Sequence, residues 1–190
     1  MALLISAALA GCSSPHVTPH LGPTFPPPSS PAAYRSLPPA THKWSLAKVQ
    51  CPTLTSTAAQ QLGVSGKGTE TRSSGHQDLI RIVECRWGPQ DRSAVSVTAK
   101  LTVTVNQAGS DAGWQLDSRL FEPEPLAGVG EEAFVSQPLD LQGVQIDVRS
   151  GNASTRIRLL PATGAADGKA ELRRAAAEIA GDVIDELVPA

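Results

Sequence analysis

The sequence has few aromatic residues and no large excess of charge of either sign. Aromatic side chains make up 4% of the 190 residues and hydrophobic ones 41%, so we expect a core built mostly from aliphatic side chains. The formal net charge is −2, which gives no reason to expect a nucleic acid as partner. No Asp or Glu precedes Glu70, and residues 44–190 carry 18 acidic and 14 basic residues, a net charge of −4. That mild excess is a common solubility feature of protein surfaces.

Common motifs of catalysis and metal binding are also missing. The chain contains no Gly-x-Ser-x-Gly elbow, no P-loop and no paired-His zinc motif. Ser45–Lys48 has the Ser-x-x-Lys spacing of acyl-serine enzymes, but the companion motifs are absent. Glu122, Glu124, Glu131 and Glu132 lack the spacing of a calcium loop and favour a solvated acidic edge. We therefore expect no cofactor, no metal site and no enzymatic activity.

A short apolar run at the start of the chain ends in Leu9-Ala10-Gly11-Cys12. This resembles the lipobox of bacterial lipoproteins, because a signal peptidase needs small residues before its cut and a free thiol must accept the diacylglycerol. Acylation of Cys12 would hold the protein on a membrane far better than a single myristoyl chain. The run is too short to span a bilayer and has no basic n-region. Residues 1–12 therefore indicate a lipoprotein signal, the alternative being the start of a core strand with Cys12 as an ordinary thiol.

The next segment, residues 13–43, is rich in proline and is called the tether below. Proline fixes φ and removes amide donors, so this segment favours extended polyproline II over helix or sheet. His16, His20 and His42 are irregularly spaced, which is typical of linker histidines rather than of a metal site. We expect a stalk between a lipid anchor and a folded domain of residues 44–190. Docking of the proline-rich run onto an aromatic groove of a partner is the alternative.

The strongest structural pattern runs from Val95 to Val105, where apolar and polar residues alternate without a break. Successive side chains of a strand point to opposite faces, so this alternation predicts a long strand with one buried face. The β-branched Val and Thr residues also favour the extended backbone.

A second strand is predicted over Asp78–Trp87, with Gly88–Ser93 turning the chain back. The expected register keeps the apolar residues on one side and pairs Trp87 with Val95, Cys85 with Val97, and Val83 with Ala99. It also places Arg81 on the buried face, so we expect a bulge, or cover on both faces, near Ile82. Before this strand, Thr55–Gly63 has the capping residues of a short helix, and Val64–Gln77 is interpreted as a mobile loop.

The second half of the chain contains another hairpin and a closing helix. Val144–Leu159 alternates around a Gly151-Asn152 turn, which predicts Ser150 opposite Ala153 and Ile146 opposite Ile157. Asn152 begins a glycosylation sequon, but its position in the turn already explains why an asparagine occurs there. The other expected elements are a helix over Ser110–Phe121, a strand over Glu131–Val135 and an amphipathic helix over Lys169–Val188. We therefore predict an α+β fold, in which two β-hairpins form an antiparallel sheet and the C-terminal helix packs on one face.

Cys51 and Cys85 are the two cysteines that remain once Cys12 is assigned to the lipid. In an exported protein, two such residues most often bond to each other. A catalytic thiol is the alternative, although no His lies at a telling position and Cys85 points into the expected core. The sequence therefore favours a disulfide between the first helix and the hairpin.

Several short motifs together resemble a family of actinobacterial secreted lipoproteins whose domain has no assigned function. The matching residues are Cys51 with Leu54, Leu62-Gly63, Cys85-Arg86-Trp87 and the run Gly128–Phe134, followed by the hairpin and the Ala-rich terminal helix. Where that family has Cys-x-Leu-Leu, this chain has Cys51-Pro52-Thr53-Leu54. The resemblance covers about residues 44–188. It implies an envelope location and an α+β domain, and it implies no reaction.

Together these features predict a non-enzymatic lipoprotein on the extracytoplasmic face of the cell membrane. We expect a monomer that contacts the membrane through the lipid on Cys12 and binds an unknown envelope molecule or protein. Trp114 and Phe121 are the candidate ligand-binding residues, because large aromatics in weakly patterned segments often line binding surfaces. Their other possible role is to plug the end of an aliphatic core. An envelope hydrolase with an unrecognised active site is the alternative function.

Overall fold

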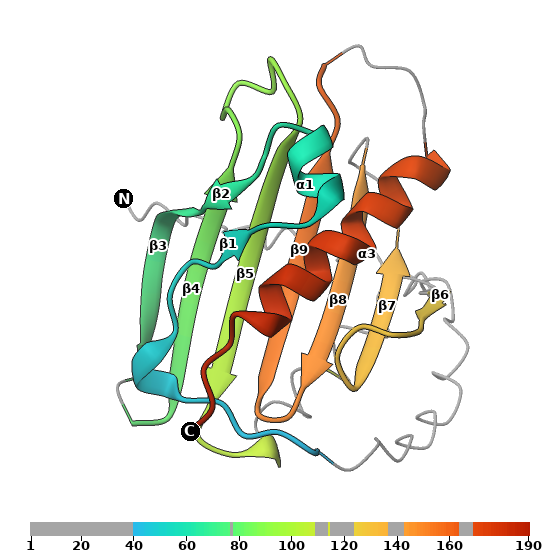
Figure 1. Cartoon of the computed structure of the whole chain (residues 1–190). Coiled ribbons are helices and arrows are strands. Elements are labelled where there is room, and N and C mark those ends of the chain that lie inside the picture. The colour runs from blue at the N-terminus through green and yellow to red at the C-terminus, as the bar shows by residue number, and fades with distance from the viewer. Residues whose placement is uncertain (1–39, 77, 109–113, 115–123, 137–142, 164–168) are drawn as a thin grey trace, which may run out of the picture. The chain divides into compact units, whose positions relative to one another are not determined.

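The computed structural model describes residues 40–76, 78–108, 114, 124–136, 143–163 and 169–190. Its main element is an antiparallel sheet of seven strands in the order β3-β4-β5-β9-β8-β7-β6 (Figure 1). These strands are β3 (Thr69–His76), β4 (Ile80–Trp87), β5 (Ser96–Thr104), β6 (Glu124–Leu126), β7 (Glu132–Ser136), β8 (Val144–Ser150) and β9 (Ala153–Leu160). The expected α+β class with an antiparallel sheet is confirmed, but the sheet extends beyond the two predicted hairpins.

The helices lie on one side of this sheet. Helix α3 (Lys169–Asp185) crosses one face, and the short helix α1 (Thr57–Gln61) packs beside it (Figure 1). The remaining elements are a 3-10 turn, η1 (Leu46–Lys48), and a two-stranded sheet of β1 (Thr53–Leu54) and β2 (Gly66–Lys67). Within the described residues, no helix is long and apolar enough to cross a membrane.

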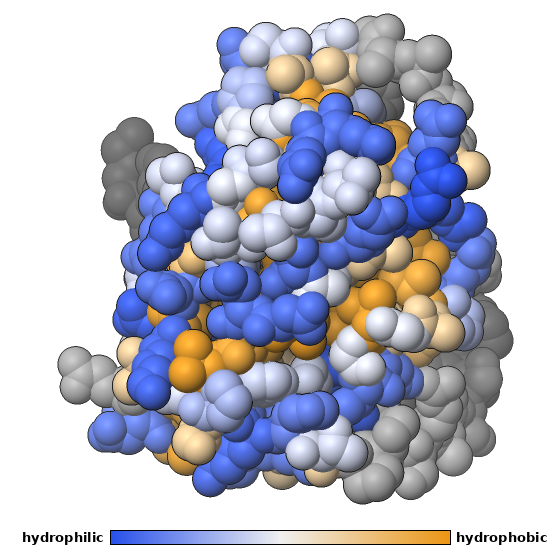
Figure 2. Space-filling view, viewed as in Figure 1, coloured by the Kyte–Doolittle hydropathy of each residue, from blue (hydrophilic) through white to orange (hydrophobic). Residues whose placement is uncertain are grey.

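The core lies between α3 and the sheet and is mostly aliphatic. It contains the apolar faces of β4, β5, β8 and β9 together with one side of α3, namely Ala176, Ile179, Ala180, Val183 and Ile184. From the helix side, Figure 2 shows polar residues over the outer surfaces of α1 and α3, with hydrophobic ones visible along the margins of α3. The apolar residues of α3 recur at helical spacing and lie on one side of the helix, and those of the strands alternate and lie on one face of the sheet. These two apolar surfaces pack together to form one core.

The polar side of α3 has a structural role as well. Asp182 accepts hydrogen bonds from the backbone N–H groups of Thr55 (3.0 Å) and Ser56 (2.9 Å), and Glu178 accepts one from Ala58 N–H (3.2 Å). These donors lie at the start of α1, where N–H groups have no partner within the helix. Helix α3 therefore caps α1 as well as covering the sheet.

The register between β4 and β5 differs from the predicted one by two residues. Trp87 lies opposite Val97, and Cys85 lies opposite Ala99. An even shift leaves every side chain on its original face, so alternation determines the phase of a strand but not which in-phase register it takes. By contrast, β8 and β9 pair Ser150 with Ala153, as the turn between them implies.

Two local predictions about the β3–β4 region are wrong. Arg81 has the phase of Val83, as expected, but its side chain is exposed. It pairs with Val103 in an unbroken ladder, so no bulge occurs at Ile82, and the alternative of cover on both faces there stays a prediction. The register shift lies in β3 instead, between Glu70 and Arg72. Most of the segment predicted as a mobile loop forms β2 and β3, because an edge strand can be polar on both faces and then shows no alternation.

Candidate functional site

Two of the predicted site residues, Cys12 and Phe121, lie outside the described part of the chain. Cys51, Cys85 and Trp114 are described, and the structure brings the two cysteines together while placing Trp114 elsewhere, against β7.

Cys51 and Cys85 form a disulfide, with their Cα atoms 5.5 Å apart. Both residues are buried in the main core cluster. The bond joins the segment before β1 to the middle of β4, and it rules out the alternative of a free catalytic thiol at either position. The disulfide prediction is therefore confirmed.

Peptide mapping of the exported protein without reductant should recover Cys51 and Cys85 in one cross-linked peptide pair. The bond closes a loop with a sequence separation of 34 residues, and chain entropy predicts a contribution of about 3–4 kcal/mol to the free energy of unfolding. Denaturant unfolding with and without reductant measures that contribution. Complete alkylation of both thiols in freshly exported, unreduced protein would contradict the assignment.

Trp114 is not the exposed aromatic that a recognition surface requires. It is 4% exposed, its Nε1 donates to Glu132 Oε2 at 2.9 Å, and its ring lies 5.7 Å from that of Phe134. Glu132 and Phe134 point away from α3, since the intervening Ala133 belongs to the core beneath it. Trp114 therefore covers the second face of the sheet over β7, and its burial favours the alternative structural role over that of an exposed binding residue.

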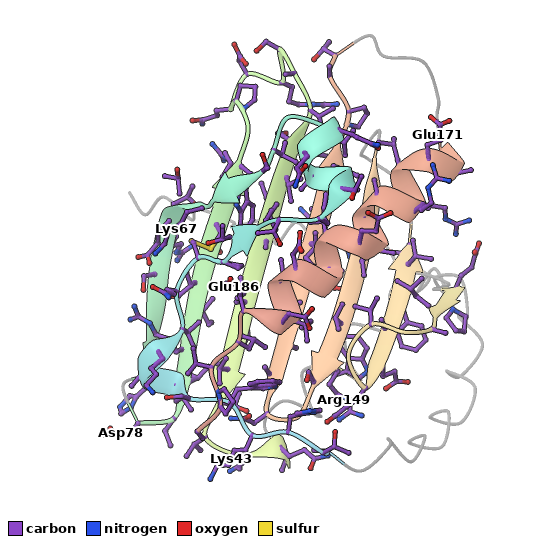
Figure 3. The ribbon with its side chains drawn as sticks, in the orientation of Figure 1. Lys43, Lys67, Asp78, Arg149, Glu171 and Glu186 are labelled. Atoms are coloured by element: carbon purple, nitrogen blue, oxygen red, sulfur yellow. A yellow bond between two sulfur atoms is a disulfide. The ribbon has the colours of Figure 1, made fainter. Side chains whose placement is uncertain are left out.

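Next to Trp114, a buried ion cluster joins β7 to the end of β8. Arg149 is fully buried, and its Nη1 lies 3.3 Å from Glu131 Oε2 while its Nε lies 3.8 Å from Glu132 Oε2. Figure 3 shows Arg149 at the end of β8, near the segment that carries Lys43. The two glutamate side chains are only 8% and 10% exposed, so the prediction that they belong to a solvated acidic edge is wrong.

Glu131 holds the first described residues of the chain. Its Oε1 accepts from Thr41 N (2.6 Å) and Thr41 Oγ1 (2.9 Å), and its Oε2 accepts from Gly151 N (2.9 Å). Burial raises the pKa of Glu131, but these hydrogen bonds and the charge of Arg149 outweigh burial and leave the pKa below its usual value. The carboxylate is therefore ionised and structural.

The Gly151-Asn152 turn completes this end of the domain. Gly151 has φ +56°, and a Cβ there would lie 1.9 Å from His42 O, so only glycine fits. Asn152 is 2% exposed; its Oδ1 accepts from Trp44 N (2.6 Å), and its Nδ2 donates to Thr104 O (2.6 Å). The side chain of the sequon asparagine is thus committed to the fold.

The side of the sheet opposite α3 gathers positive charge. Because alternate residues of β3, β4, β5 and β9 point away from the core, five cations share this side, which we call the cationic face: Arg72, Arg86, Lys100, Arg156 and Arg158. Glu84 and Asp147 are on the same side, as are Arg149 and Glu132, whose charges cancel, so the net charge of this side is +3. The described residues from 44 onward carry no net charge in total. The charge of the domain is therefore strongly segregated.

Two of these cations are held by a hydrogen-bonded chain along β8. Arg158 Nε donates to Gln145 Oε1 (2.9 Å), Gln145 Nε2 donates to Asp147 Oδ2 (2.7 Å), and Arg156 Nε donates to Asp147 Oδ1 (2.7 Å). Each guanidinium is thereby fixed in orientation over the sheet. This site was not predicted from the sequence, although the polar positions of the predicted strands contain four of the five cations, Arg86, Lys100, Arg156 and Arg158.

Two hollows open on the surface, and one of them borders the cationic face. One of about 380 Å³ is lined by His42, Lys43, Val105 and Asn152, and one of about 400 Å³ by Lys67, Arg86 and Trp87 among others. Among the residues that the structure describes, no group of His, Cys, Asp or Glu side chains could hold a metal ion. The cationic face meets the second hollow at Arg86.

Comparisons with known proteins found no matching family model, no matching curated protein and no matching solved structure.

Proposed function

We propose that this protein is a lipoprotein of the bacterial cell envelope, of the actinobacterial kind that its short motifs resemble. It is anchored on the extracytoplasmic face of the membrane through a lipid on Cys12, and its domain is a binding or accessory module rather than an enzyme. The observation that carries this proposal is the Cys51–Cys85 disulfide, because such bonds persist in oxidising compartments outside the cytoplasm. The Leu9–Cys12 motif and the proline-rich tether supply the means of attachment.

The polar groups of the domain support a binding role more than the alternative of an envelope hydrolase. A general acid or base needs a carboxyl group that can reach a substrate. Glu131 has a shifted pKa, but hydrogen bonds from Thr41 and Gly151 and the ion pair with Arg149 already engage both of its oxygens. The cationic face, in contrast, presents half-buried and exposed charges, two of which, Arg156 and Arg158, are held in orientation by hydrogen bonds.

Anchoring is tested by Cys12→Ala, expressed behind a complete lipoprotein signal in a host that lipidates such proteins. Removing the thiol removes the acceptor for the diacylglycerol, so nearly all of the protein should move from the membrane fraction to the soluble fraction. Ser14→Ala is the matched control and should remain with the membrane. If Cys12→Ala stays in the membrane fraction and the parent protein carries no lipid mass on residue 12, the proposal is wrong.

A further inference from the structure

We propose that the cationic face binds a linear anionic polymer whose polyol units are joined by phosphodiester groups. This inference rests on the proposed binding role and names the ligand class for it. Charge complementarity is its first support, since a net charge of +3 is concentrated on one side, whereas the described residues from 44 onward carry no net charge in total. A surface with this excess of cations is suited to an acidic partner.

The chemistry of the side chains favours phosphate groups. Four of the five cations are arginines, whose planar fork matches phosphate oxygens better than the point charge of lysine does. Arg156 and Arg158 are already oriented by Asp147 and Gln145, so little side-chain freedom is lost when a ligand binds. These contacts fix two guanidinium groups, two residues apart on β9, in orientation.

The spacing of the charges favours a repeating chain. Thr98 lies between Arg86 and Arg158 in the cross-strand register, and Lys100 lies opposite Arg156. Strand geometry separates neighbouring positions by about 5 Å across the sheet and next-but-one positions by about 7 Å along a strand. Successive phosphodiester groups can therefore meet successive cations, while the hydroxyl of Thr98 faces the polyol between them.

The degree of exposure of the cations distinguishes between a narrow polymer and a flat membrane as the ligand of this face. Arg86, Arg156 and Arg158 are half-buried among their neighbours on the sheet, whereas Arg72 and Lys100 are exposed. A lipid surface would reach the two exposed cations and fail to reach most of the three recessed guanidinium groups. A thin chain that lies along the sheet can contact all of them, which is why we infer a soluble polymer rather than anionic lipid headgroups.

The test uses the full chain with Cys12→Ala in every protein, titrated at low salt with short poly(glycerol phosphate) by calorimetry. The double variant Arg86→Gln/Lys100→Gln removes two charges and leaves the chain of Arg158, Gln145, Asp147 and Arg156 in place. We expect its affinity to fall about 25-fold, at about fivefold for each charge taken from an anionic contact.

The matched control is Lys48→Gln/Arg174→Gln, which has the same net charge but removes exposed cations away from the cationic face. It should bind as tightly as the parent. Equal losses in the two double variants, no binding by the parent, or binding to phosphatidylglycerol vesicles in place of the polymer would each overturn the inference. Because no protein in this titration carries Cys12, these outcomes are independent of membrane anchoring, which only the fractionation experiment tests.

Discussion

Ile179→Asp should unfold the domain. Ile179 is fully buried, on the side of α3 that packs against the sheet in the main core cluster. Removing its side chain alone costs about 2–5 kcal/mol, as for other large-to-small core changes. The new carboxylate would in addition be buried without a partner, which adds further free energy. Since a domain is stable by only about 5–15 kcal/mol, we expect the loss of most of the folded population at room temperature.

Urea unfolding followed by far-UV circular dichroism measures this effect. Ala170→Asp is the matched control, because it introduces the same charge at an exposed position of the same helix. An acidic residue near a helix N-terminus is neutral or mildly stabilising, so this variant should keep the parent midpoint. Equal midpoints for the two variants would show that α3 does not pack against the sheet.

The elements with a clear period were predictable from the sequence, and the registers between them were only partly so. Alternation over Val95–Val105 places β5, and the helical period places α3. The same alternation permits any even shift, and the β4–β5 register differs by two residues from the expected one. The strand β3 was not predicted because it lies at the edge of the sheet and buries neither face, so its sequence shows no alternation of apolar and polar residues.

The candidate site was harder to predict than the fold, for a physical reason. Glu131 and Arg149 are 18 residues apart, and only the antiparallel pairing of β7 with β8 brings them together. Charged residues are mostly exposed in proteins, so we expect exposure wherever they occur. The sequence gives no signal that distinguishes a buried ion pair from two solvated side chains. Trp114 was misjudged in the same way, because its partners Glu132 and Phe134 lie on a strand whose position depends on the whole sheet.

Glu131→Gln should destabilise the domain by about 3–5 kcal/mol, the cost of breaking a buried ion pair. Each oxygen of Glu131 accepts from a backbone N–H group, one from Thr41 and the other from Gly151, and the second oxygen also faces Arg149. The glutamine NH₂ group must replace one of these oxygens, so in either orientation a donor would face other donors. Glu124→Gln is the matched control, since Glu124 is exposed and pairs with Arg173 at the surface, where such pairs contribute about 0–1 kcal/mol.

The pH dependence of the same pair of proteins distinguishes loss of charge from loss of packing. Hydrogen bonds and Arg149 hold the pKa of Glu131 below its usual value in the folded state. A carboxylate of this kind stabilises the fold in full above its unfolded pKa, about 4.3 for glutamate, and that stabilisation is lost as the pH falls through the lower folded pKa. Acidification should therefore destabilise the parent more than Glu131→Gln. The unfolding midpoints of the two proteins should converge at a pH below the folded-state pKa of Glu131. A difference in stability that stays constant from neutral to acidic pH would mean that the ionised carboxylate is not what holds Thr41, Gly151 and Arg149 together.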